Sequence, residues 1–249
     1  MKSNYRYIVK AFMAMAVIAG TTSCDDFLDR EPMSSISPET YYSTAAQLEA
    51  NLNDEYPNVL PSFGQWTYGI FGEDKGTDNQ IEVNANDRYT QDRWKVPHSE
   101  SDNWKFERIY RINFFLSEAL PKFGEDMSGS QNTISGSVAT IKHYIGEMYF
   151  LRAYEYFKKL QLFGDFPIIN QPLADEMEAL REASKRFPRN EVARFIISDL
   201  DKAYAYMSDV DMATTRINKD AAMLVKSRVA LFEATWLQNF KGTAFVPGG

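Results

Sequence analysis

Cysteine and histidine are almost absent from this chain of 249 residues, which has one cysteine and two histidines. A closed structural zinc site needs four ligands of these types, so zinc fingers and zinc ribbons are excluded. A single cysteine cannot form a disulfide within the chain. The fold must therefore be held together by packing.

Positive charge is also scarce, because 27 lysines and arginines face 34 aspartates and glutamates and leave a net charge of −7. Proteins that bind nucleic acids neutralise phosphates with lysine and arginine. This balance argues against a nucleic-acid partner. The 44% of hydrophobic and 14% of aromatic residues are typical of a globular chain with a substantial core.

The first residues have the pattern of a secretory signal. Lys2, Arg6 and Lys10 precede an apolar run from Ala11 to Gly20. Only 13 uncharged residues separate Lys10 from Cys24, fewer than the roughly 20 that cross a bilayer as a helix. A permanent membrane span is therefore disfavoured.

The signal ends in Thr21-Thr22-Ser23-Cys24, which resembles a bacterial lipoprotein signal. In such signals, cleavage makes the cysteine the first mature residue, and its sulfur then carries a lipid. A plain secretory signal beside an incidental free cysteine is the alternative. Cleavage before Cys24 would remove three positive charges and lower the net charge to −10.

We divide the chain into a signal peptide (1–23), a tether and N-terminal segment (24–43) and a helical domain (44–249). Apolar residues with a period near 3.6 predict helices at 44–54, 98–120, 136–162, 190–207 and 218–240. Helix 136–162 is apolar on most of its circumference, which predicts burial on several sides. The fold class is all-α, with tetratricopeptide-like antiparallel pairs, 98–120 with 136–162 and 190–207 with 218–240, and long irregular loops.

Five segments in sequence order resemble the SusD/RagB family of Bacteroidetes outer-membrane lipoproteins. They are Cys24 to Pro32, Trp104 to Leu116, Gly146 to Pro167 with its Phe150-Leu151-Arg152-Ala153-Tyr154 core, Asp199 to Ala203, and Ala221 to Leu231. The resemblance implies a helical scaffold anchored by lipid to the outer face of the outer membrane. It also implies a binding protein without catalysis, which captures a nutrient as the lid of a TonB-dependent, SusC-like transporter.

Family members are longer than this chain, which we therefore expect to be the N-terminal portion of a larger binding protein. From this we expect exposed apolar surface on the last helix, around Phe232, Trp236 and Phe240. Trp104, Tyr110 and Trp236 lie in helical stripes and are expected in the core.

Sugar binding needs aromatic faces for stacking and polar side chains for the hydroxyls. The long loop at 62–97 offers both. Tyr89 and Trp94 are the first candidates, since in the family an aromatic downstream of an acidic dipeptide such as Asp78-Asn79 often faces the glycan. Trp66 is a third candidate, although it and Phe71 also suit a role in fixing the loop to the helices. Ca²⁺ binding is an alternative role for this oxygen-rich loop. Its side chains do not follow the order of an EF-hand, so a solvated polar loop is favoured.

Signatures of catalysis and of cofactor binding are missing. No two glycines have the G-x-G spacing, and a serine triad could use only His98 or His143. His143 falls in an apolar helical region, where a packed histidine is the simpler reading. Arg152 lies in the same apolar helix, and Asp165 is its expected partner in a structural clamp. We predict no catalytic residue, no metal and no cofactor; a secreted glycosidase has no specific support.

The sequence thus predicts a surface-exposed lipoprotein of the outer membrane. It would be lipidated on Cys24, bind an oligosaccharide through Tyr89, Trp94 and Trp66, and deliver this nutrient to its transporter. The alternative is a helical-repeat lipoprotein that binds peptides or only its transporter.

Overall fold

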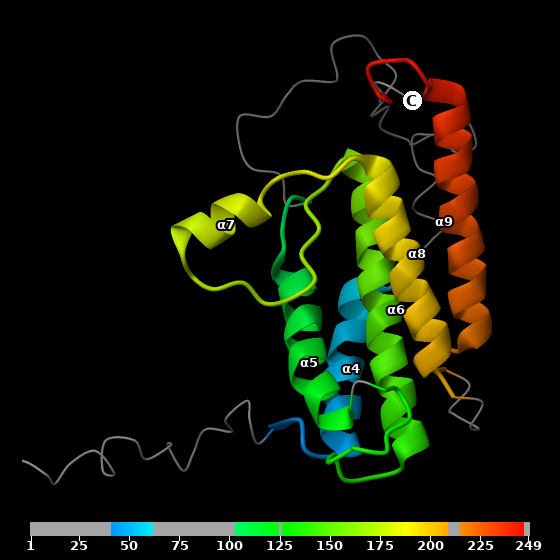
Figure 1. Cartoon of the computed structure of the whole chain (residues 1–249). Coiled ribbons are helices and arrows are strands. Elements are labelled where there is room, and N and C mark those ends of the chain that lie inside the picture. The colour runs from blue at the N-terminus through cyan, green and yellow to red at the C-terminus, as the bar shows by residue number, and fades with distance from the viewer. Residues whose placement is uncertain (1–40, 62–102, 125, 209–214, 247–249) are drawn as a thin grey trace, which may run out of the picture. The chain divides into compact units, whose positions relative to one another are not determined.

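Helices make up nearly all the regular structure of the described residues, which are 41–61, 103–124, 126–208 and 215–246 of the computed structural model. They are α4 (Ala45–Val59), α5 (Glu107–Phe123), α6 (Val138–Phe163), α7 (Met177–Ala183), α8 (Arg189–Tyr206) and α9 (Lys219–Phe240), as Figure 1 shows. Within these ranges the β-structure is limited to isolated bridges. The predicted all-α class is confirmed.

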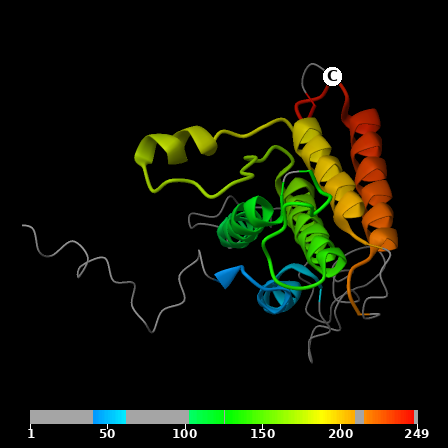
Figure 2. The same ribbon diagram turned by 60° about the horizontal axis from the view of Figure 1, so that its bottom comes forward.

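The six helices belong to one unit, which runs from Tyr42 to Gly249, and α6 lies at its centre. It packs most extensively against α8 and also contacts α4, α5 and α9. Seventeen of the 26 residues of α6 are buried, as its continuous apolar pattern predicts. Figures 1 and 2 show α5 and α6 running in opposite directions, as do α8 and α9. Both predicted helix pairs are therefore present.

The ends of the helices follow their capping residues. Ser137 caps α6 and Asn218 caps α9, each by accepting a backbone N–H three residues later. Thr44, and not Ser43, caps α4 in a capping box with Gln47. The predicted end of α4 before Pro57 is wrong, because the helix continues to Val59. Pro57 lies in the last turn, so the hydrogen bond that it removes is one of the last in the helix.

Two further elements differ from prediction. Helix α5 begins at Glu107, not near residue 98. Helix α7 was not predicted, and it has only seven residues, none of them buried. Because its side chains are exposed, the sequence of α7 has no apolar period that would predict a helix. Tyr110, expected in the core, is 52% exposed.

Helices α6 and α8 approach closely at Gly146. A Cβ atom there would lie 2.8 Å from the backbone N of Met207 and 2.9 Å from the carbonyl O of Ala203. Alanine normally favours a helix over glycine by about 1 kcal/mol, yet we expect Gly146→Ala to lower the free energy of unfolding by about 1–3 kcal/mol because the helices must separate. Urea unfolding tests this, with exposed Ser198→Ala as the control. Stabilisation by Gly146→Ala would contradict the close approach.

Apolar side chains are exposed along α9, although they are not the ones expected. Phe232, Trp236 and Phe240 are partly buried, and the rings of Trp236 and Phe240 lie 4.4 Å apart. The exposed apolar residues of this helix are Met223, Leu224 and Leu231. The expected apolar surface is thus present on other side chains of the same helix.

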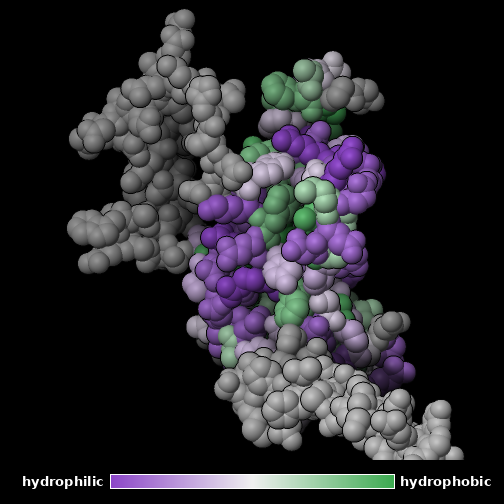
Figure 3. Space-filling model, turned by 90° about the vertical axis from the view of Figure 1, so that its left-hand side faces the viewer, coloured by the Kyte–Doolittle hydropathy of each residue, from purple (hydrophilic) through white to green (hydrophobic). Residues whose placement is uncertain are grey.

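Polar residues predominate on the face shown in Figure 3, where apolar side chains form smaller patches between them. Among the described residues, none of the helices has both the length and the apolar character that crossing a bilayer requires. The apolar residues of these helices serve mainly to pack the helices against one another.

Candidate ligand-binding site

The predicted ligand residues Tyr89, Trp94 and Trp66 lie outside the described residues, as does the predicted lipidation site, Cys24. They remain predictions. The structure does describe the chain on both sides of the aromatic loop. The chain before it ends at Pro61, and the chain after it resumes at Asn103.

Two successive lysines of α6 hold the chain on either side of this loop. Lys158 Nζ donates to the carbonyl O of Val59 at 2.8 Å. Lys159 Nζ donates to the carbonyl O of Asn103 at 2.7 Å. The last turn of α4 and the approach to α5 are therefore both fixed to the C-terminal half of α6. The described residues that precede and follow the predicted sugar-binding loop in sequence thus contact the same helix.

Glu155 pairs with both lysines. It lies one turn before them on α6, and its carboxylate is 2.7 Å from Lys158 Nζ and 3.3 Å from Lys159 Nζ. The side chains of Glu155 and Lys159 are only 3% and 8% exposed. Buried charges of this kind persist only when they are paired and hydrogen-bonded. The three residues therefore act as one unit that fixes the two backbone carbonyls.

A second ion pair fixes the end of α4 to the start of α5. Arg111 donates to the carboxylates of Asp54 and Glu55. Burial raises the pKa of Glu55, and the nearby charge of Arg111 opposes that shift. Paired charges of α4, α5 and α6 thus hold the end of α4 and the start of α5 in place.

The predicted clamp between Arg152 and Asp165 is wrong. Arg152 instead forms a bidentate pair with Asp199 of α8, at 2.7 Å from Nε and 2.9 Å from Nη2. Asp165 lies just past the end of α6, which is eleven residues after Arg152, or about 16 Å along the helix axis at 1.5 Å per residue. Asp165 accepts the backbone N–H of Arg189 at 2.9 Å and thereby caps α8.

Arg152 connects three helices. Its Nη1 donates to Asn113 Oδ1 of α5 at 2.8 Å and to the carbonyl O of Asn170 at 3.0 Å. Burial opposes the charge of Arg152, but the hydrogen bonds and charge of Asp199 raise its pKa, so it stays ionised. Nε, Nη1 and Nη2 each donate within the protein. These four hydrogen bonds support the predicted structural role of Arg152, with a different partner.

His143 is a packed histidine, as expected. Its Nδ1 accepts the backbone N–H of Ser208 at 3.3 Å, so the ring hydrogen belongs on Nε2, which lies 2.9 Å from the carbonyl O of Ile217. Nε2 also lies 3.0 Å from the carboxylate of Glu147. Both ring nitrogens are therefore engaged. In the described part of the chain, no group of three or more metal-ligating side chains occurs.

Comparisons with known proteins agree with this fold. A family model described as SusD-like, starch-binding and associating with the outer membrane, matches residues 26–231. SusD-like protein P25 of Formosa agariphila is 25% identical over 86% of this chain and 41% of its own length. SusD-like protein P2 of the same organism is 25% identical over 97% of this chain and 46% of its own length. The chain spans less than half the length of these relatives.

Solved structures share the arrangement of helices. A SusD-like protein from Bacteroides fragilis matches 83% of this chain and 38% of its own length, with 19% identity and a TM-score of 0.51. A SusD-like carbohydrate-binding protein from the same species matches 79% of this chain and 39% of its own, with 18% identity and a TM-score of 0.51. At these identities the likeness concerns the fold alone.

The match over residues 26–231 covers all five segments that carry the resemblance, apart from the first two residues of the first segment. The chain belongs to the SusD-like family, whose members are described as starch-binding and associated with the outer membrane.

Proposed function

We propose that this protein binds an oligosaccharide at the cell surface and delivers it to a TonB-dependent, SusC-like transporter of the outer membrane. The observation that carries the proposal is the family match over residues 26–231, with its description as starch-binding and associating with the outer membrane. A SusD-like protein from Bacteroides fragilis that shares this fold is also described as carbohydrate-binding.

Tyr89 and Trp94 are the proposed stacking residues, with Trp66 as a third contact. Their rings suit the apolar faces of a pyranose, and the asparagines and aspartates around them suit its hydroxyls. The contacts of Lys158 and Lys159 support this assignment, because they hold the chain on both sides of the loop. The residues held in this way are Val59, three positions before the loop, and Asn103, six positions after it.

The protein would act without catalysis. Among the described residues, the most deeply buried ionisable groups are engaged with protein partners, as in the Arg152–Asp199 pair and at His143. We further propose that Cys24 carries a lipid and anchors the mature chain to the outer membrane.

One set of measurements on the full chain tests this function. Immobilised oligosaccharides and peptides are presented to the protein expressed with its signal, and the mature N-terminus is analysed by mass spectrometry. We expect glycan binding and an acylated Cys24. Peptide binding without glycan binding would favour the alternative cargo, and an unmodified Cys24 would remove the anchor.

A further inference from the structure

A cleft lies where α4, α5, α6 and α9 meet. Its volume is about 490 Å³, within the range of roughly 300–1,000 Å³ that is typical of small-molecule sites. The end of α4 and the residues after it form one wall. The lining residues are Asn58, Val59, Leu60, Pro61, Arg108, Tyr154, Phe157, Lys158, Gln161, Val225 and Arg228.

The lining of this cleft is cationic in an acidic protein. Arg108, Lys158 and Arg228 contribute positive charge, and none of the eleven lining residues is a carboxylate, whereas the chain as a whole carries a net charge of −7. Glu155 lies next to the cleft, but it is committed to Lys158 and Lys159. Its distance to Arg108 is 3.8 Å, and Arg108 is half exposed. The cleft therefore keeps an excess of positive charge.

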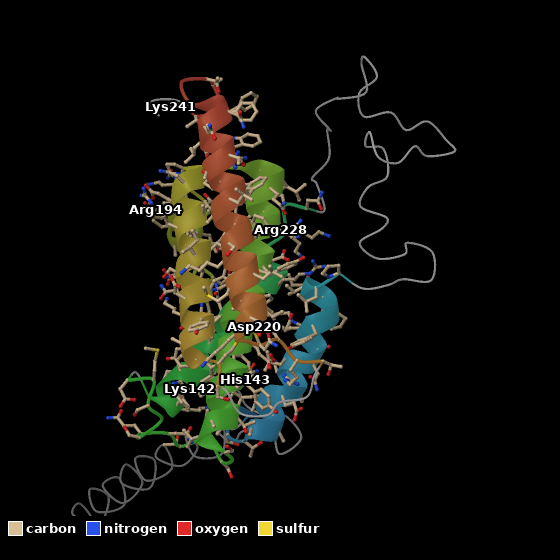
Figure 4. All side chains as sticks on the ribbon, turned by 90° about the vertical axis from the view of Figure 1, so that its right-hand side faces the viewer. Lys142, His143, Arg194, Asp220, Arg228 and Lys241 are labelled. Atoms are coloured by element: carbon tan, nitrogen blue, oxygen red, sulfur yellow. The ribbon has the colours of Figure 1, made fainter. Side chains whose placement is uncertain are left out.

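Arg228 carries the most available of these charges. No carboxylate of the described residues forms an ion pair with it, and Figure 4 shows it on α9, on the side toward α4. A guanidinium presents a planar set of donors that matches two oxygens of a carboxylate or a sulfate. An arginine without an ion pair among the described residues, in a cleft whose described lining contains no acid, is thus suited to an oxyanion.

The rest of the lining suits a sugar ring. Tyr154 supplies aromatic surface, whereas Phe157 is only 4% exposed. Asn58 and Gln161 supply amides that both donate and accept hydrogen bonds. Lys158 Nζ lies 5.9 Å from the centre of the Tyr154 ring, so charge and aromatic surface adjoin. One cleft therefore offers the groups needed for a ring and for an attached anion.

We propose that this cleft is a subsite for an acidic sugar, one that bears a carboxylate or a sulfate group. The inference rests on the proposed glycan-binding function and names its substrate class. Val59, Leu60 and Pro61 line the cleft, and in the sequence they directly precede the loop that carries the proposed sugar-binding aromatics.

The first test measures affinity by calorimetry for oligogalacturonate, which carries only carboxylates, and for a sulfated galactan oligosaccharide. The carboxyl-reduced and desulfated forms of the same sugars are the neutral controls. We expect at least one acidic form to bind more tightly than its neutral form, and Arg228→Gln to weaken that binding about tenfold or more. Arg194→Gln, which removes an exposed charge on α8, should leave it unchanged. Equal affinity for charged and neutral forms, binding of neutral forms only, or wild-type affinity in Arg228→Gln would overturn the subsite and leave glycan binding intact.

The second test does not depend on glycan binding. Phenylglyoxal modifies arginines, and mass spectrometry of the digested protein measures its extent at each site. We expect sulfate to protect Arg228 in the full chain and to leave Arg194 reactive. If no glycan binds but Arg228 is protected, the anion site stands and the proposed function fails. If sulfate protects both arginines equally or neither of them, the cleft is not an anion site.

Discussion

Replacement of Arg152 by methionine is expected to lower the free energy of unfolding by about 3–5 kcal/mol. The change removes both hydrogen bonds to Asp199 and leaves that fully buried carboxylate without its main partner. Lys202 lies 3.9 Å away but is 47% exposed, so it compensates little. For a chain of this size, the melting temperature should fall by on the order of 10 °C. Thermal and urea unfolding followed by circular dichroism measure both quantities.

Arg194→Met is the matched control for Arg152→Met, because it makes the same chemical change at an exposed position of α8. It should alter stability by no more than about 0.5 kcal/mol. The double variant Arg152→Met/Asp199→Leu removes both buried charges and should recover much of the loss. A loss in Arg152→Met no larger than that in the control would contradict the structural role of this pair.

Replacement of Arg216 by methionine is expected to have the next largest effect, a loss of about 3 kcal/mol. Arg216 donates to the fully buried carboxylate of Glu147 from Nε at 2.8 Å and from Nη2 at 2.7 Å. Only the hydroxyl of Tyr56, at 2.7 Å, and the ring of His143 would then remain near that carboxylate. Burial and the charge of Glu147 raise the pKa of Tyr56, which keeps its hydroxyl a donor. Urea unfolding measures the loss.

Glu49→Gln provides the comparison for this second pair. Glu49 is a weaker partner of Arg216, at 3.5 Å and 45% exposed, so its replacement should cost less than about 0.5 kcal/mol. Removing both buried charges in Arg216→Met/Glu147→Gln should recover part of the stability lost in Arg216→Met. If Glu49→Gln destabilised the protein as much as Arg216→Met, the buried contact with Glu147 would not be the source of the effect.

The sequence predicts the helices of the core well, because their signals are local. The apolar period places α6, α8 and α9 within two residues of their observed ends. The start of α5 is less predictable. Pro97 and the serines that follow it are as compatible with the end of a loop as with the cap of a helix. Helix α7 has no buried face, so no apolar period indicates it.

Partners of buried charges are harder to predict, because they depend on how helices meet. Arg152 and Asp199 are 47 residues apart in sequence and come together only through the packing of α6 on α8. Asp199 belongs to one of the segments that carry the family resemblance, and this is the sequence feature that singles it out. Lys158 and Lys159 donate to backbone carbonyls, which have no side-chain signature.

The ligand residues are a different case, since their prediction rests on chemistry and not on packing. Aromatic and amide side chains in the 62–97 loop predict sugar binding without defining which rings face the sugar. The structure adds the fixed chain ends and a cationic cleft beside one of them. These features favour a site at this end of the helical unit.

Glycan affinity of Tyr89→Ala and Trp94→Ala, compared by calorimetry with that of the wild type, tests the central claim most directly. The glycan is the one bound most tightly by the wild-type chain, and circular dichroism verifies that each variant is folded. We predict that at least one variant loses affinity about tenfold or more, equivalent to about 1.4 kcal/mol, while Arg194→Gln keeps it. Wild-type affinity in both folded aromatic variants would contradict the account and remove the aromatic loop as the sugar-binding site.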